Sequence, residues 1–131
     1  MMTKEQHMDY WKKSAEVDYD TIYALFKEKR FVHALFFCHL FLEKILKCAW
    51  VHSNLENSPP RTHNLIRLFS ETKLNLDDVQ TEFLRRMNDF QIEGRYPDYM
   101  FLINKMCTPD FTSEVLNDFE KIRECIQKQL P

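Results

Sequence analysis

Apolar residues recur every three or four positions along most of this 131-residue chain, which is the spacing of an amphipathic helix. One glycine and five prolines leave few positions at which the backbone favours a turn. Short connections between long helices favour an all-α, up-and-down four-helix bundle with an additional short helix. The pattern predicts long helices over about 4–27, 31–52, 76–90 and from 109 onward, and the short one over 63–71.

Residues next to the predicted helix ends refine these limits. Asn75 is expected to cap the helix over 76–90, in which Val79 should point inward, and Thr108 should cap the last helix. Residues 91–107 show no clear helical period and are expected to form a long irregular link. Links of this length in small domains are often functional.

The predicted helix over 31–52 is apolar on two opposite sides. One side carries the expected core residues Phe31, Leu35, Cys38, Leu42, Ile45 and Ala49. The other side carries Phe36, Phe37, Leu40 and Val51 around a polar line of His39, Glu43 and Lys47. Since a four-helix domain of this size covers only one side of such a helix, we expect a second subunit or a ligand pocket to cover the other.

The composition describes one self-sufficient helical domain over residues 1–131. Hydrophobic residues make up 44% of the chain, which is enough for an ordinary core without a metal or a disulfide. The net charge of -2 argues against binding nucleic acid through bulk charge, while a local basic groove remains open. Acidic residues of the first helix, Asp18 among them, are expected to face water.

The four cysteines form no C-x-x-C pair, and we expect them to be reduced packing residues. The apolar stretch 31–50 is interrupted by charged residues and histidines, which is wrong for a membrane span, and the amino terminus is polar. These features predict a soluble, cytoplasmic protein.

Three segments together resemble one known family. The segment "ALFFCHLFLEKILKCAW" at 34–50 is a long apolar helix with a Glu-Lys pair beginning at Glu43 and a further lysine, Lys47. The segment "PPRTHNLIRLF" at 59–69 contains proline followed by Thr-His-x-Leu, and "GRYPD" at 94–98 contains Arg-Tyr-Pro-Asp. In this order and spacing they are similar to the HEPN domain (higher eukaryotes and prokaryotes nucleotide-binding). The resemblance covers essentially the whole chain.

The resemblance implies a helical bundle that usually forms a homodimer, with its second long helix and the segment near Arg95 close to the two-fold axis. In this chain the expected interface is the helix containing Phe36, Leu40, Glu43 and Lys47. Some members of the family cleave RNA without a metal, often as the toxin of a toxin-antitoxin pair with a minimal nucleotidyltransferase. Other members bind nucleotides or serve as scaffolds, and the fold alone does not choose among these functions.

The nuclease members have an arginine followed, after four to six residues, by a histidine that can move a proton near neutral pH. Arg95 aligns with that arginine, but Met100, Phe101 and Leu102 occupy the positions of the histidine. We therefore expect a domain that binds a nucleotide or a partner protein without catalysis of its own. One alternative is a metal-independent endoribonuclease toxin, and another is a purely structural dimer that partners a nucleotidyltransferase.

The candidate ligand residues are Arg95, Tyr96, Asp98, Glu43, Lys47, His63 and Arg61. An arginine beside a phenol suits a phosphate and a stacked base, although Arg95 could instead pair with Asp98 and only stabilise the fold. Glu43 and Lys47 predict a buried polar cluster in which Arg95 is the expected partner of Glu43.

His63 has a functional and a structural interpretation. It could contact a phosphate or a ribose, with Arg61 adding charge, or it could only pack at a helix start. In the nuclease alternative His63 or His39 would replace the missing histidine. No cofactor or metal is expected, since His39 has only Glu43 at metal-ligand spacing.

Overall fold

The computed structural model describes residues 1–131 and contains helices and connecting segments only. The elements are α1 (Lys4–Lys27), α2 (Phe31–Ser53), α3 (Leu65–Ser70), α4 (Asp78–Met87), the 3-10 helix η1 (Asn88–Phe90), α5 (Pro97–Met106) and α6 (Pro109–Lys128). The predicted all-α helical bundle is confirmed.

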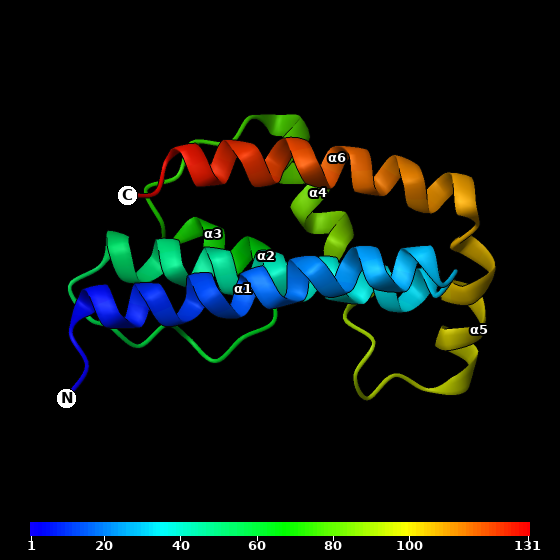
Figure 1. Cartoon of the computed structure of the whole chain (residues 1–131), viewed down its shortest axis with the longest axis horizontal. Helices are drawn as coiled ribbons and strands as arrows, with labels where there is room; N and C mark the ends of the chain where they lie inside the picture. The colour runs from blue at the N-terminus through cyan, green and yellow to red at the C-terminus, as the bar shows by residue number, and fades with distance from the viewer.

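Helix α2 is the centre of the bundle (Figure 1). Helix α1 packs antiparallel along it, α6 runs along the same axis, and α3 and α4 pack against α2 from behind in this view. Helix α5 lies at one end and crosses the direction of the long helices. The side of α2 that was expected to need a second subunit or a ligand is therefore partly covered by the chain itself. Phe36 and Leu40 remain half-buried, while Val51 is fully buried.

The first and last long helices begin where the local sequence predicts. Thr3 and Gln6 form a capping box at the start of α1, in which each side chain bonds the backbone N–H of the other residue. Thr108 accepts a hydrogen bond from the N–H of Phe111, and Pro109 occupies the first position of α6. Both starts depend on residues within one helical turn, which is why the sequence predicts them.

Glu120 of α6 joins that helix to α1. Its carboxylate accepts hydrogen bonds from the hydroxyls of Tyr19, at 2.8 Å, and of Tyr23. The Nε of Arg123 donates to the other oxygen at 2.7 Å. Burial alone would raise the pKa of Glu120, but these hydrogen bonds outweigh it and hold the pKa below its usual value.

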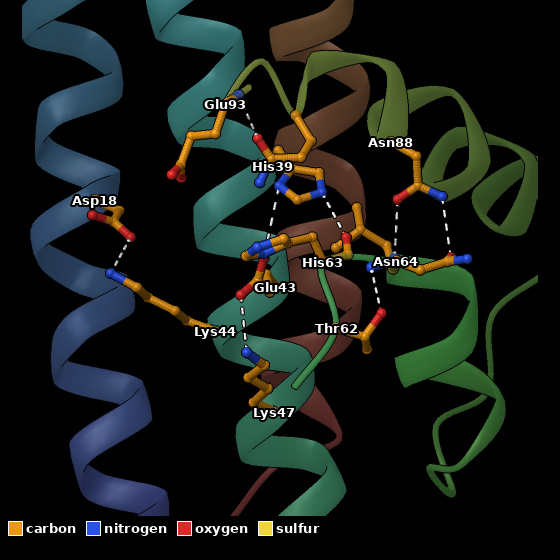
Figure 2. A network of polar contacts seen from close by, with 12 residues as sticks. Asp18, His39, Glu43, Lys44, Lys47, Thr62, His63, Asn64, Asn88 and Glu93 are labelled. Carbon is orange, nitrogen blue, oxygen red and sulfur yellow. Dashed lines mark hydrogen bonds and ion pairs between the residues drawn. The ribbon is translucent and has the colours of Figure 1, made fainter. Parts of the chain in front are cut away.

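The expectation that Asp18 faces water is wrong, because Asp18 is buried against α2. Its Oδ2 lies 2.7 Å from the Nζ of Lys44, as Figure 2 shows. Helix α1 contacts α2 along most of its length, so a carboxylate on the inner side of α1 loses its water. The ion pair with Lys44 offsets that loss.

The third long helix is shorter than predicted. Helix α4 begins at Asp78 because Asp77, not Asn75, forms a capping box with Gln80. Val79 then lies in the first turn and is 79% exposed, contrary to the expectation that it points inward.

The irregular link predicted over 91–107 contains the ten-residue helix α5. Pro97 occupies the first helical position, where its missing N–H costs no hydrogen bond. The period is hidden in the sequence because only Ile103 of this helix is buried, while Phe101 and Leu102 are exposed. An apolar helix that the rest of the chain does not cover produces no amphipathic pattern.

Candidate functional site

The carboxylate of Glu43 is the centre of a buried polar cluster halfway along α2. Glu43 is only 6% exposed, and each of its carboxylate oxygens contacts a partner side chain (Figure 2). Lys47 donates to Oε2 at 2.9 Å from the next turn of α2, and Nδ1 of His63 lies 2.8 Å from Oε1. The predicted burial of Glu43 and its pairing with Lys47 are thus seen in the fold, and the fold adds the contact with His63.

His39 anchors the loop that carries His63. Its Nε2 lies 2.9 Å from the backbone carbonyl of His63, and since a carbonyl only accepts, Nε2 carries a hydrogen. The other nitrogen, Nδ1, has no hydrogen-bond partner and lies 4.0 Å from Oε1 of Glu43. Burial lowers the pKa of His39, with the charge of Glu43 only partly opposing this effect. A neutral, fully buried imidazole holds the loop and has no access to a ligand in solvent.

The His63 side chain has the opposite environment, because its imidazole is 60% exposed. A carboxylate only accepts hydrogen bonds, so the Nδ1 that contacts Glu43 must carry a hydrogen. The contact therefore fixes the tautomer and orientation of the ring and leaves Nε2 as the nitrogen that can meet a ligand.

Asparagine contacts fix the backbone around His63. The N–H of Asn64 bonds the hydroxyl of Thr62, and Oδ1 of Asn64 accepts from the N–H groups of Ile66 and Arg67 in the first turn of α3. Asn88, from the start of η1, bonds both the Asn64 side chain and the N–H of Leu65 (Figure 2). The loop is held by α2 on one side and by η1 on the other.

The two cations of this region, Arg61 and Lys47, differ in exposure. Arg61, two residues before His63, is exposed. The Lys47 side chain is only 12% exposed, and its Nζ lies 5.2 Å from the centre of the Trp11 ring. Lys47 therefore neutralises Glu43 inside the bundle, whereas Arg61 is available to a ligand.

Arg95 does not pair with Glu43, so that expectation is wrong. Lys47 and His63 already occupy the two carboxylate oxygens. Arg95 instead donates from Nε to the backbone carbonyl of Gln91 at 3.1 Å, and its guanidinium lies 4.4 Å from the centre of the Tyr99 ring. The arginine is exposed at the point where the chain enters α5.

Tyr96 and Asp98 lie beside Arg95 at the start of α5. Tyr96 precedes the first helical residue and is 79% exposed. Asp98 accepts the N–H of Tyr99 at 3.0 Å and forms no ion pair with Arg95. The structure thus divides the predicted residues into two groups, one around His63 and one at the start of α5.

Sequence reasoning missed the tertiary roles of three residues. The sequence indicates His39 as part of a polar line on its helix, as a substitute acid-base group or as an incomplete metal ligand, and it does not single out Asn88 or Tyr99. The hydroxyl of Tyr99 donates to the carbonyl of Asp89, which ties α5 to η1. The only local signal was the position of His39 four residues before Glu43.

No histidine follows Arg95 in the sequence, so α5 carries no imidazole. Met100 is half-buried, and Phe101 and Leu102 are exposed on α5. The structure contains no group of three or more histidine, cysteine, aspartate or glutamate side chains placed to hold a metal ion. The main surface pockets lie away from Glu43, His63 and Arg95.

These features define an all-α bundle in which a buried glutamate of the central helix pairs with a lysine of that helix and with an exposed loop histidine, and in which an Arg-Tyr-Pro-Asp segment begins a late helix. The family model of the HEPN domain matches residues 8–129, and the chain belongs to the HEPN domain family. No curated protein and no solved structure matches the sequence. None of the helices has the length and apolar character that crossing a bilayer requires.

Proposed function

We propose that this HEPN domain binds a nucleotide through its phosphate groups, at the surface around His63 and Arg61, without cleaving it. The observation that carries the proposal is the contact of His63 with Glu43. A buried carboxylate orients an exposed imidazole and leaves its Nε2 free. An imidazole that only packed at a helix start would not need a buried charge behind it.

The chemistry of these two side chains suits a phosphate and a ribose. Protonated Nε2 of His63 donates to a phosphate oxygen, and neutral Nε2 accepts from a ribose hydroxyl. Arg61 is exposed and offers the forked N–H groups that bind phosphate in a bidentate manner. Glu43 is paired with Lys47, so it presents little free negative charge to repel an anion.

Arg95 and Tyr96 provide a second set of contacts on the same side of the molecule. The loops 54–64 and 91–96 both project below α1 in the view of Figure 1. Arg95 is exposed and Tyr96 is 79% exposed, so a phosphate and the face of a base could be held there. The proposed site therefore extends from the loop of His63 towards the start of α5.

A second candidate function, RNA cleavage, has one observation in its favour. Nε2 of His63 is positioned to accept a proton from a ribose hydroxyl, while Arg95 could hold the phosphate. His39 cannot serve in its place because it is fully buried.

The expected homodimer through Phe36 and Leu40 and the nucleotidyltransferase partner remain proposals that follow from the family.

The nucleotide proposal is tested by thermal unfolding with ATP, GTP and other nucleotides. A nucleotide at about 100 times its dissociation constant adds about 2.7 kcal/mol, which raises the melting temperature measurably. Arg61→Ala and His63→Ala should lose most of this shift. His33→Ala removes an exposed histidine on α2, outside the proposed site, and should retain the thermal shift. The proposal fails if no nucleotide raises the melting temperature or if His63→Ala retains the full shift.

The second candidate is separated from the first by incubating the protein with RNA. Cleavage that is lost in both Arg95→Ala and His63→Ala would establish the nuclease. Intact RNA together with a nucleotide-dependent thermal shift would support binding alone.

A further inference from the structure

One buried polar atom beside the loop of His63 has no partner. His39 is fully buried in α2, and its Nδ1 forms no hydrogen bond. An unpaired buried acceptor destabilises a fold, and protein interiors contain few of them. An apolar side chain at this position of α2 would leave no such atom. The presence of an imidazole at position 39 therefore has a reason other than the packing of the core.

The other ring nitrogen of His39 supplies that reason. Nε2 donates its hydrogen to the backbone carbonyl of His63 at 2.9 Å. One turn further along α2, Glu43 accepts from Nδ1 of the His63 side chain at 2.8 Å (Figure 2). Residues four positions apart lie on the same side of a helix, so α2 holds the main chain of His63 from one turn and its side chain from the next. These two contacts fix the direction in which Nε2 of His63 points.

The main chain of His63 has no substitute for the bond from His39. It is the only hydrogen bond in the structure to the N–H or the carbonyl of His63. The contacts of Asn88 hold the next two residues, Asn64 and Leu65, at the start of α3. The bond from His39 therefore determines the placement of His63, while the start of α3 is held independently.

A neutral imidazole carries one ring hydrogen, so His39 can donate to only one of two acceptors. With the hydrogen on Nε2 the ring holds the loop. With the hydrogen on Nδ1 it would instead face Oε1 of Glu43, which lies 4.0 Å away. Burial lowers the pKa of His39 and keeps the ring neutral, with the charge of Glu43 opposing this effect in part and the charge of Lys47 adding to it. The unpaired Nδ1 is thus the consequence of donating the single hydrogen to the carbonyl of His63.

We propose that His39 is the positioning residue of the nucleotide site, and that its bond to the carbonyl of His63 holds the His63 ring in the orientation and tautomer that meet the ligand. The inference rests on the function proposed above and adds a buried residue to the exposed ones that bind. His39 does not touch the nucleotide, because its side chain does not reach the surface. Without its hydrogen bond the main chain at His63 moves away from Glu43, Nδ1 of His63 loses the carboxylate, and the His63 ring takes either tautomer.

Two substitutions that differ by one methylene group separate positioning from packing. In His39→Gln the amide nitrogen lies about as far from Cβ as Nε2 does, so it can donate to the same carbonyl. In His39→Asn the amide nitrogen lies near the position of Nδ1 and faces Glu43 instead. His39→Leu is a third variant that has no donor at all, and circular dichroism verifies that each variant is folded.

Isothermal titration calorimetry at neutral pH, with ATP as the probe, compares these variants. His39→Gln should bind ATP within about threefold of the unmodified chain, whereas His39→Asn and His39→Leu should bind at least about tenfold more weakly, because each has lost one orienting hydrogen bond. His33→Gln, at an exposed histidine of the same helix, is the matched control and should leave the affinity unchanged. Equal affinities of the glutamine and asparagine variants would overturn the proposal.

Nitrogen-15 NMR of the imidazole rings tests the same role in the absence of a nucleotide. In the unmodified chain and in His39→Gln, the ring hydrogen of His63 should be found on Nδ1, as its contact with Glu43 requires. In His39→Asn the two nitrogen signals of His63 should move towards the average of the two tautomers. A side chain that only packed would not change this signature. A His63 tautomer that is the same in the glutamine and asparagine variants contradicts the positioning role.

The two measurements separate this inference from the function on which it rests. If the unmodified chain does not bind ATP but the tautomer of His63 changes in His39→Asn, the proposed function fails and the positioning of His63 by His39 stands. If every variant binds ATP equally and the tautomer of His63 does not change, His39 has no positioning role and the proposed function stands.

Discussion

Replacing Glu43 by glutamine tests whether the buried cluster on α2 is held together by charge. Glutamine keeps the shape of the side chain and an oxygen that can accept from His63, but it leaves the ammonium of Lys47 without a counter-charge. Removing one partner of a buried ion pair costs about 3 to 5 kcal/mol when the remaining charge is fully enclosed. Lys47 retains 12% exposure and its contact with the Trp11 ring, so we expect a loss of about 2 to 3 kcal/mol.

Urea unfolding followed by circular dichroism measures this loss as a lower midpoint with an unchanged slope. Glu82→Gln is the matched control, because Glu82 pairs with Arg85 at the same distance of 2.9 Å but is 58% exposed. That control should lose less than about 0.5 kcal/mol. The double variant Glu43→Gln/Lys47→Met removes the orphaned cation and should regain at least half of the lost stability.

Two results would refute the reasoning. One is a Glu43→Gln variant as stable as Glu82→Gln, which would mean that water reaches the cluster and screens the charge. The other is a double variant no more stable than Glu43→Gln, which would mean that the loss came from the contact with His63 rather than from Lys47.

Three further predictions concern a lysine that binds the end of α2, the turn before α5 and the effect of pH. Lys4 donates to the carbonyls of Val51 and Asn54, both at 2.7 Å, and to the side chain of Asn57 at 3.0 Å. Lys4→Met should therefore lower the free energy of unfolding, measured in urea, by about 1 to 2 kcal/mol. The control Lys13→Met, at an exposed lysine, should lower it much less. Gly94 has φ +75°, so Gly94→Ala should cost about 1 kcal/mol by backbone strain although open space surrounds it; no loss would contradict the left-handed conformation. Hydrogen bonds lower the pKa of Glu120, so its contribution to stability is present above its unfolded value near 4.5 and is lost as the pH falls through the folded value. Glu120→Gln should therefore flatten the acid side of the stability profile, and an unchanged profile would contradict that role.

Local signals explain which helices the sequence predicts correctly. The starts of α1 and α6 depend on Thr3 and Thr108, whose side chains bond N–H groups within the same turn. The start of α4 was missed because Asn75 and Asp77 are both good capping residues, and only Asp77 has a glutamine three residues later to complete the capping box. Helix α5 was missed because its apolar residues are largely exposed and leave no periodic pattern.

The candidate site divides in the same way. Glu43 and Lys47 stand four residues apart on one helix, so their contact follows from helical geometry alone. His63 reaches Glu43 across 20 residues of sequence, and the similarity to the HEPN domain brought it into consideration without specifying the contact. Arg95 was assigned to Glu43 by charge, but the fold places it over Tyr99 instead.

By itself the sequence determined the helical class, the ends of the helices with strong caps and the family, because these depend on periodicity and on residues within one turn of each other. Only the tertiary structure decided which charges meet between different elements of the fold. The packing of the helices buries Asp18 against Lys44 and brings His63 into contact with Oε1 of Glu43. It leaves Arg95 and the outer face of α5 exposed. The physical reason is that the partner of a buried charge is set by the path of the loops and the packing of the helices, and a linear pattern carries neither.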